Sequence, residues 1–158
     1  MIATSLLRVP IHGRVDPREL PAMWERLVAV IGGCVYRRKP DAQWTMELMS
    51  DAVRDLTGYD PHRFIHNASL AFANLIAPDD RARVEDAVAA AVRERRRATL
   101  HYRLRTAYRR LLPIEDRLVP VYDAQGRVVA IEGIFDLATF GPGQRRGPAE
   151  NAVAVPAA

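Results

Sequence analysis

Apolar residues recur at helical spacing between residues 16 and 31, and charged residues occupy the opposite side. The pattern predicts an amphipathic helix that begins near Asp16 or Pro21. It should end at Gly32, because glycine readily adopts positive φ at a helix C-terminus. The apolar side of this helix consists of Leu20, Met23, Trp24, Leu27 and Ile31.

Shorter patterns follow the helix. Residues 34–37 and 44–49 are rich in β-formers and are separated by a turn, which predicts a hairpin. Ser50 is expected to cap a short helix over residues 51–56, and Gly58 to end it. Apolar residues between 62 and 76 lack a clean period, which indicates short helical turns packed on a core.

A longer helix is predicted from Pro78 to about Arg96, with two acidic residues in its first turn. Strands are predicted from residue 100, over 114–122 and over 127–137. Residues 128–131 are all apolar, which is typical of a central strand covered on both faces. The helix at residues 16–31 is the candidate cover for the second face.

The order of elements predicts an α+β domain with a five-stranded antiparallel sheet. Short helices should cover one face, and the N-terminal amphipathic helix the other, which we call the outer face. Residues 1–15 are expected to be a flexible N-terminus. Residues 141–158 are rich in glycine, proline and alanine and are expected to be a disordered tail.

Composition narrows the class of protein. The 158 residues suit one domain, and 49% are hydrophobic, which excludes a wholly disordered chain. Cys34 is the only cysteine, so no intramolecular disulfide can form and a reducing, cytoplasmic location is expected. The sequence has no stretch long and apolar enough for a membrane span. The net charge of +4 comes without a nucleic-acid-binding motif, so no nucleic-acid partner is expected.

Residues 33–140 carry short motifs in a characteristic order. The motifs are Val35-Tyr36-Arg37, Leu56-Thr57-Gly58-Tyr59, Ile76-Ala77-Pro78-Asp79-Asp80-Arg81, Tyr102-Arg103-Leu104-Arg105, Val121-Tyr122-Asp123-Ala124-Gln125-Gly126-Arg127 and Ile131-Glu132-Gly133-Ile134-Phe135-Asp136. In this order they resemble the PAS domains of bacterial sensor kinases and diguanylate cyclases. The resemblance implies the strand order 2-1-5-4-3 and helices that enclose a possible ligand cavity.

The sequence departs from the PAS pattern between its third and fourth strands. Where such domains usually carry Asp-Gly and then tryptophan, this chain has Ala107-Tyr108-Arg109-Arg110 and then Pro113. Because proline cannot donate to a sheet ladder, the fourth strand is expected to begin after Pro113 or to bulge there. The expected absence of an output module also implies that any signal passes to another polypeptide in trans.

Catalytic motifs are absent from the sequence, so no catalytic residue and no metal site are predicted. A small hydrolase or isomerase without a recognisable motif stays as an alternative. Cys34 lacks the sequence context in which flavin-binding PAS relatives form a photoadduct, and it is interpreted as a core residue.

No cofactor is expected, although a small-molecule ligand or haem could occupy the cavity. Some PAS domains bind haem through a histidine, and His66 is the candidate because it lies in an apolar segment. The alternative is an ordinary surface or hydrogen-bonded histidine. The candidate cavity lining is Met46, Phe64, Leu70, Phe72 and Leu104.

The leading hypothesis is a single-domain PAS signalling protein that acts as a sensor or adaptor. Its expected partner is a histidine kinase or a cyclic-dinucleotide enzyme, and a homodimer is expected as well. The candidate interface is Trp24, Leu27 and Ile31, on the apolar side of the N-terminal helix. A cofactor-bearing or metabolite-binding PAS sensor is the alternative.

Overall fold

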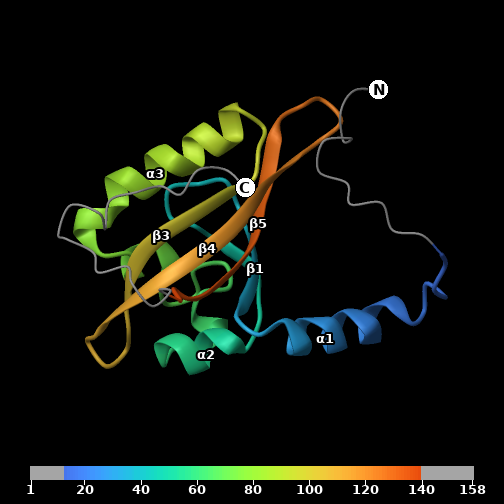
Figure 1. Ribbon diagram of the computed structural model, residues 1–158, viewed down its shortest axis with the longest axis horizontal. Coiled ribbons are helices and arrows are strands. Elements are labelled where there is room, and N and C mark those ends of the chain that lie inside the picture. The colour runs from blue at the N-terminus through green and yellow to red at the C-terminus, as the bar shows by residue number, and fades with distance from the viewer. Residues whose placement is uncertain (1–12, 140–158) are drawn as a thin grey trace. The chain divides into compact units, whose positions relative to one another are not determined.

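The computed structural model describes residues 13–139 of the chain (Figure 1). Of the predicted flexible segment, residues 1–15, all but residues 13–15 lie outside the described residues, and so does the predicted disordered tail, residues 141–158. The elements in chain order are α1 (Leu20–Ile31), β1 (Cys34–Arg38), β2 (Met46–Met49), α2 (Ala52–Thr57), the 3₁₀ helices η2 (Pro61–Arg63) and η3 (Phe72–Leu75), α3 (Pro78–Arg93), β3 (Ala98–Arg105), β4 (Leu111–Tyr122) and β5 (Val128–Leu137).

The segment up to Gly32 and the segment from Gly33 are separate compact units. In the first unit, the predicted amphipathic helix is confirmed as α1. It begins at Leu20, later than Asp16, because residues 17–19 form a turn. No residue of α1 is buried. Coverage of the outer sheet face by this helix therefore stays a prediction.

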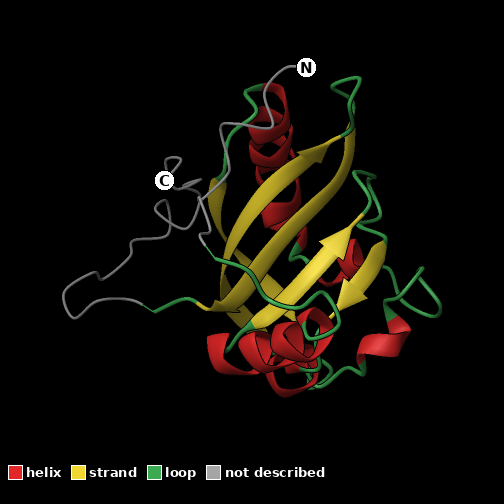
Figure 2. Cartoon of the chain, turned by 90° about the vertical axis from the view of Figure 1, so that its right-hand side faces the viewer, coloured by secondary structure: helices red, strands yellow, loops and turns green. Residues whose placement is uncertain are grey.

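The second unit is built on one antiparallel sheet in the order β2-β1-β5-β4-β3. This is the strand order that the resemblance implied, and Figure 2 shows the strands as one twisted layer. The first and last strands, β1 and β5, are neighbours in the middle of the sheet, and β2 and β3 form its two edges. The pairing of β1 with β5, which are far apart in the chain, joins the N-terminal hairpin to the three C-terminal strands.

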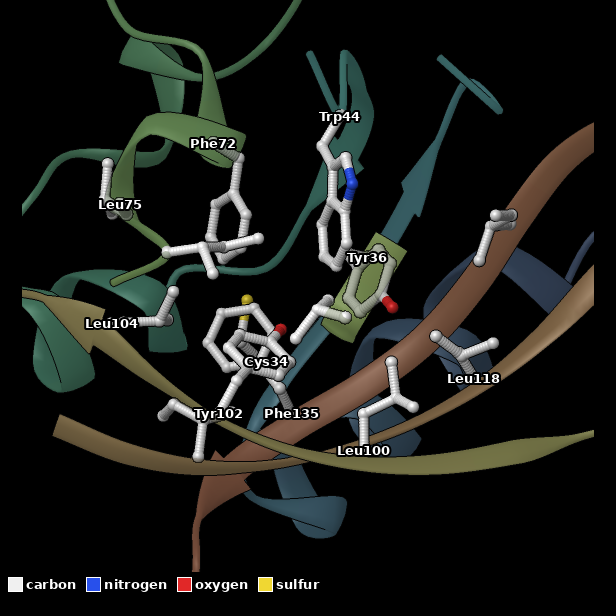
Figure 3. Packing of buried hydrophobic residues seen from close by; sticks show 14 of the residues in the cluster. Cys34, Tyr36, Trp44, Phe72, Leu75, Leu100, Tyr102, Leu104, Leu118 and Phe135 are labelled. Atoms are coloured by element: carbon white, nitrogen blue, oxygen red, sulfur yellow. The ribbon is translucent and has the colours of Figure 1, made fainter. Parts of the chain in front are cut away.

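One face of the sheet forms the hydrophobic core with the helices. Alternation along β3 and β4 points every second residue inward, as the burial pattern of both strands shows. These side chains pack against Val53 of α2, Phe72 of η3 and Val84 of α3. Figure 3 shows Phe72 and Trp44 packed among side chains of this inner face, including Tyr36 and Phe135.

The expected start or bulge of the fourth strand at Pro113 is wrong. β4 begins at Leu111 and pairs with β3 without a register shift. Opposite Pro113, the backbone N–H of Arg103 donates to Asp80 and so faces away from β4. The pair is therefore not hydrogen-bonded, and the proline nitrogen faces the side where β5 has already ended at Leu137.

The apolar run at residues 128–131 is covered on both faces only in part. Ala130 and Ile131 are buried, but Val129 is 41% exposed. The reason is local, because Val129 lies where the register between β4 and β5 shifts at Val121 and Tyr122. The continuous run of apolar residues therefore predicted deeper burial for this end of β5 than the structure has.

Ser50 does not cap α2. Its hydroxyl oxygen accepts a hydrogen bond from the Val35 N–H at 3.0 Å, so the side chain joins the start of β1 to the segment that follows β2. Asp51 occupies the cap position with no side-chain hydrogen bond to the helix. Gly58 ends α2 in the left-handed conformation, as predicted.

The acidic first turn of α3 also forms a hydrogen-bonded ion pair with β3, in addition to its favourable interaction with the helix dipole. Asp80 is buried, and its carboxylate accepts hydrogen bonds from the Arg103 backbone N–H and from Nε, both at 2.9 Å. Arg103 Nη2 donates to the second oxygen at 3.1 Å. Burial alone would raise the Asp80 pKa, but these bonds from Arg103 outweigh it and hold the pKa below its usual value. The contact fastens α3 to β3.

Candidate functional site

Polar side chains meet inside the core, on the inner face of three strands. Asp116 of β4 is buried and accepts hydrogen bonds from Tyr36 of β1 at 3.0 and 3.1 Å and from Tyr102 of β3 at 2.8 Å. Arg38, two residues after Tyr36 on the same face, is buried as well. We call Tyr36, Arg38, Tyr102 and Asp116 the buried polar network.

Gly133 creates the space that this network needs. Tyr36 faces Gly133 on β5, and Gly133 in turn faces Leu118 on β4, so Tyr36 must reach across β5 to contact Asp116. A β-carbon at position 133 would lie 2.7 Å from the Tyr36 hydroxyl oxygen. Only glycine leaves the path from β1 to β4 open.

Burial dominates the acid–base properties of the network. It raises the pKa of Asp116 to about 6, against opposing effects of the two tyrosine hydrogen bonds and of the Arg38 charge. Burial also raises the pKa of Tyr36 and of Tyr102 well above the usual value, and the Asp116 charge adds to both shifts. Asp116 is therefore the group of the network that can exchange a proton near neutral pH.

Arg38 carries a positive charge into the core. Its guanidinium carbon lies 3.8 Å from the centre of the Trp44 ring, and Nη1 donates to the Lys39 carbonyl oxygen at 3.1 Å. Nε and Nη2 have no hydrogen-bond partner among the described residues. Burial lowers the Arg38 pKa, while electrostatic interactions with Tyr36 and Asp116 act against that shift.

Trp44 is held in place by a strained loop. Its φ of 55° lies in the left-handed region, which a bulky residue adopts only at a cost in free energy. The loop that holds it is closed by the Trp44 N–H to the Asp41 carbonyl at 3.2 Å and by the Thr45 N–H to the Asp41 carboxylate at 3.0 Å. The ring stacks on Phe72 and lies edge-on to Tyr102, with centroids 6.1 Å apart in both pairs. Trp44 therefore connects Arg38 with the aromatic core.

Residues 47–135 match a family model described as the PAS fold. The chain belongs to the PAS family. No curated protein sequence matches the chain.

Solved structures give the same fold for this PAS domain. A PAS domain from Colwellia psychrerythraea has a TM-score of 0.64 at 18% identity, covering 76% of this chain and 98% of its own. A sensory box histidine kinase/response regulator from Burkholderia thailandensis has a TM-score of 0.59 at 23% identity, with 73% and 84% covered. The N-terminal domain of a diguanylate cyclase with PAS/PAC sensor from Marinobacter aquaeolei has a TM-score of 0.57 at 16% identity, with 66% and 94% covered.

The structure brings most of the predicted cavity lining together. Met46, Phe64, Phe72 and Leu104 are buried in one cluster, and Leu70 is half-buried against it. His66 is exposed, with a φ of 51°, and its backbone N–H donates to the Met46 carbonyl oxygen at 2.8 Å. The structure therefore places the His66 side chain on the surface and not among the lining residues, and haem ligation by it stays a prediction.

The described residues offer neither a reactive thiol nor a metal site. Burial raises the pKa of the Cys34 thiol to about 12, so it stays protonated and is a poor nucleophile. Among residues 13–139 no group of histidine, cysteine and acidic side chains could hold a metal ion. None of the described helices is long and apolar enough to cross a membrane.

Sequence reasoning missed the buried polar network, although a signal was present. Alternation along β1 puts Cys34, Tyr36 and Arg38 on one face, so an inward arginine follows from an inward Tyr36. Asp116 likewise stands between the inward residues Ile114 and Leu118. Charged residues at inward strand positions are the feature that could have identified the network.

The predicted interface residues of α1 are all accessible. Trp24 is 48% exposed, Leu27 47% and Ile31 50%. A helix that shows this much apolar surface lacks the burial that normally stabilises an amphipathic helix in a protein.

Proposed function

We propose that this PAS domain is a signalling sensor and adaptor that acts through protein contact in trans and not by catalysis. Its site of action would be the cytoplasm, where its single buried thiol stays reduced. The PAS family and the sensor proteins among its structural neighbours support a role in signal transduction. The buried polar network supplies a place in the core where a change of protonation could alter the sheet.

The observation that carries the proposal is the apolar stripe of α1. Leu20, Trp24, Leu27 and Ile31 follow one another at intervals of four, three and four residues, which is the spacing of a two-helix coiled-coil seam. All four are exposed to a similar degree. A helix from a second chain would cover the whole stripe at once.

Two kinds of chain could supply that helix. A second copy of this chain would give a homodimer, because the same stripe can pair with itself about a twofold axis. A signalling enzyme would give the adaptor complex. A histidine kinase or a cyclic-dinucleotide enzyme is the proposed class, since structures of both kinds of sensor protein resemble this chain.

The test compares two aspartate substitutions on the same helix. Leu27→Asp places a charge in the stripe, whereas Ala29→Asp places it at an exposed position outside the stripe. We expect Leu27→Asp to abolish self-association in light scattering and capture of a signalling enzyme from native cells, and Ala29→Asp to retain both. Equal behaviour of the two variants, or turnover of a metabolite by the purified protein, would contradict the proposal.

A second candidate function is ligand sensing in the core. The unpartnered Nε and Nη2 of Arg38 favour it, because buried donors without an acceptor are rare and costly. The purified protein is nevertheless expected to be colourless, without flavin or haem. An absorption spectrum tests this, and loss of a Soret band in His66→Ala would assign that histidine as a haem ligand.

A further inference from the structure

The hairpin that joins β3 to β4 presents a cationic and aromatic surface. Arg105 and residues 107–111 are exposed, and the segment from Leu104 to Ile114 contains no acidic residue. Tyr108 is 75% exposed and Leu111 49%. We call this the hairpin surface, and it consists of Arg105, Tyr108, Arg109, Arg110 and Leu111.

The three arginine side chains of the hairpin surface have no hydrogen-bond or ion-pair partner in the described part of the chain. Many arginines elsewhere in the same unit do have one. Arg54 pairs with Asp60, Arg93 with Glu94, and Arg127 with Asp123. The hairpin therefore differs from a surface on which cations and anions simply alternate.

The backbone of the hairpin is held in a defined shape. The Thr106 N–H donates to the Arg110 carbonyl oxygen at 2.8 Å, and the Arg109 N–H donates to the Thr106 carbonyl oxygen at 3.0 Å. The Ala107 N–H donates to the carbonyl oxygen of Thr57, at the end of α2, at 2.8 Å. Preorganisation of this kind lowers the entropy lost on binding.

Tyr108 makes a second contact, with Gly58 at the C-terminal end of α2. A β-carbon on Gly58 would lie 2.7 Å from Cε2 of the Tyr108 ring, so the ring rests directly on the glycine backbone. One part of the ring is thereby supported while most of its surface faces solvent. An accessible tyrosine that rests on backbone, with arginines beside it, has the composition of a protein-binding hot spot.

Arg109 has a strained backbone conformation. Its φ of 60° is the left-handed conformation, which in this type of hairpin turn is ordinarily taken by glycine. The arginine therefore stands where a glycine would fit with less strain. A strained residue at an exposed tip is consistent with a side chain used for recognition.

We propose that the hairpin surface binds an acidic segment of a partner protein. The arginine guanidiniums would pair with carboxylates, and Tyr108 and Leu111 would contact apolar side chains between them. The inference rests on the proposed function, because it names the chemistry of the partner. It adds a contact surface on the PAS core that does not involve α1.

An acidic protein fits the hairpin surface better than a nucleic acid does. Arg105 is the direct cross-strand neighbour of Leu111, so apolar and cationic groups alternate at the base of the hairpin. Sequence-independent binding to nucleic acid instead relies on a groove of cations that tracks many phosphates. The surface offers three cations with apolar groups between them.

The experiment measures binding of a labelled Glu-Glu-Leu repeat peptide to the full chain. We expect backbone NMR shifts on titration to concentrate at residues 105–111. The triple variant Arg105→Gln, Arg109→Gln, Arg110→Gln should weaken peptide binding about tenfold or more, because it removes charge-assisted hydrogen bonds. The matched control Arg54→Gln, Arg93→Gln, Arg127→Gln changes net charge equally and should weaken it less than about threefold.

Equal loss in the two triple variants, or shifts spread away from residues 105–111, would overturn the proposal. Tighter binding of an oligo-dT strand than of the peptide at the same residues would overturn it in favour of a nucleic acid. Leu27→Asp separates the two proposals, since it should leave peptide binding unchanged. The peptide could bind as expected while Leu27→Asp and Ala29→Asp have equal effects on self-association and partner capture. That result would support the hairpin surface and contradict only the α1 interface.

Discussion

A β-carbon on Gly133 would lie 2.7 Å from the hydroxyl oxygen of Tyr36, well inside the distance that real atoms adopt. The glycine lies opposite Tyr36 on the neighbouring strand and lets its ring reach Asp116, two strands away. The hydrogen bond between Tyr36 and Asp116 therefore depends on the absence of a side chain on a third residue.

Gly133→Ala should destabilise the fold by roughly 2 kcal/mol, because the added methyl group displaces Tyr36 and leaves Asp116 with one hydrogen bond fewer. Urea unfolding measures the loss. In the Tyr36→Phe background that hydrogen bond is already gone, so the same substitution should cost less. Strictly additive effects of the two substitutions would show that the cost of Gly133→Ala does not come from the hydrogen bond between Tyr36 and Asp116. Cζ of the Tyr36 ring and the Arg117 carbonyl oxygen would also lie close to the added carbon, at 2.8 and 2.9 Å.

Asp116 should make stability depend on pH between 3.8, its unfolded pKa, and about 6, its folded pKa. The folded state holds the proton more tightly, so this contribution is fully present below pH 3.8 and is lost as the pH rises through 6. When the pH is lowered from 7.5 to 4, the free energy of unfolding of the wild type should rise by on the order of 2–3 kcal/mol relative to that of Asp116→Asn. Denaturant unfolding of both proteins at the two pH values tests this, and a constant difference would contradict it.

Arg38→Met should raise the pKa of Asp116 further, because it removes the guanidinium charge that stabilises the carboxylate in the wild type. Methionine has a similar volume and can fill the space against Trp44. NMR titration of the Asp116 side-chain carboxyl carbon measures the midpoint. Arg38→Lys keeps the charge and should move the midpoint less than Arg38→Met does. An unchanged midpoint in the methionine variant would mean that the charge of Arg38 does not reach Asp116.

Arg109→Gly should stabilise the protein by about 0.5–1 kcal/mol, because glycine adopts the left-handed conformation without strain. Arg110→Gly is the matched control at the next residue. It lacks the positive φ of Arg109, so it should give no gain. Thermal unfolding of the two variants measures the difference. A loss of stability in Arg109→Gly would show that the arginine side chain contributes to the fold.

The amino-acid sequence determined most of the local structure, whereas the order of the strands was implied only by the resemblance to PAS domains. Strict alternation in β3 and helical spacing in α1 were enough to predict both elements, because the period of apolar residues reflects which side is buried. The Pro113 prediction failed because a proline is tolerated where the neighbouring strand has ended, and strand ends depend on the whole sheet.

Tertiary structure alone decided the candidate site. Tyr36 and Asp116 are 80 residues apart in the chain, and they meet because β5 lies between their strands and carries glycine at the crossing point. The sequence indicates that each side chain points inward, but the register of three strands sets which of them are within hydrogen-bond distance. Surface arginines such as Arg54 and Arg127 pair with acidic residues only a few positions away, and the segment from Leu104 to Ile114 has none. Only the folded chain shows that, among the described residues, no acidic side chain from another element reaches the hairpin arginines instead.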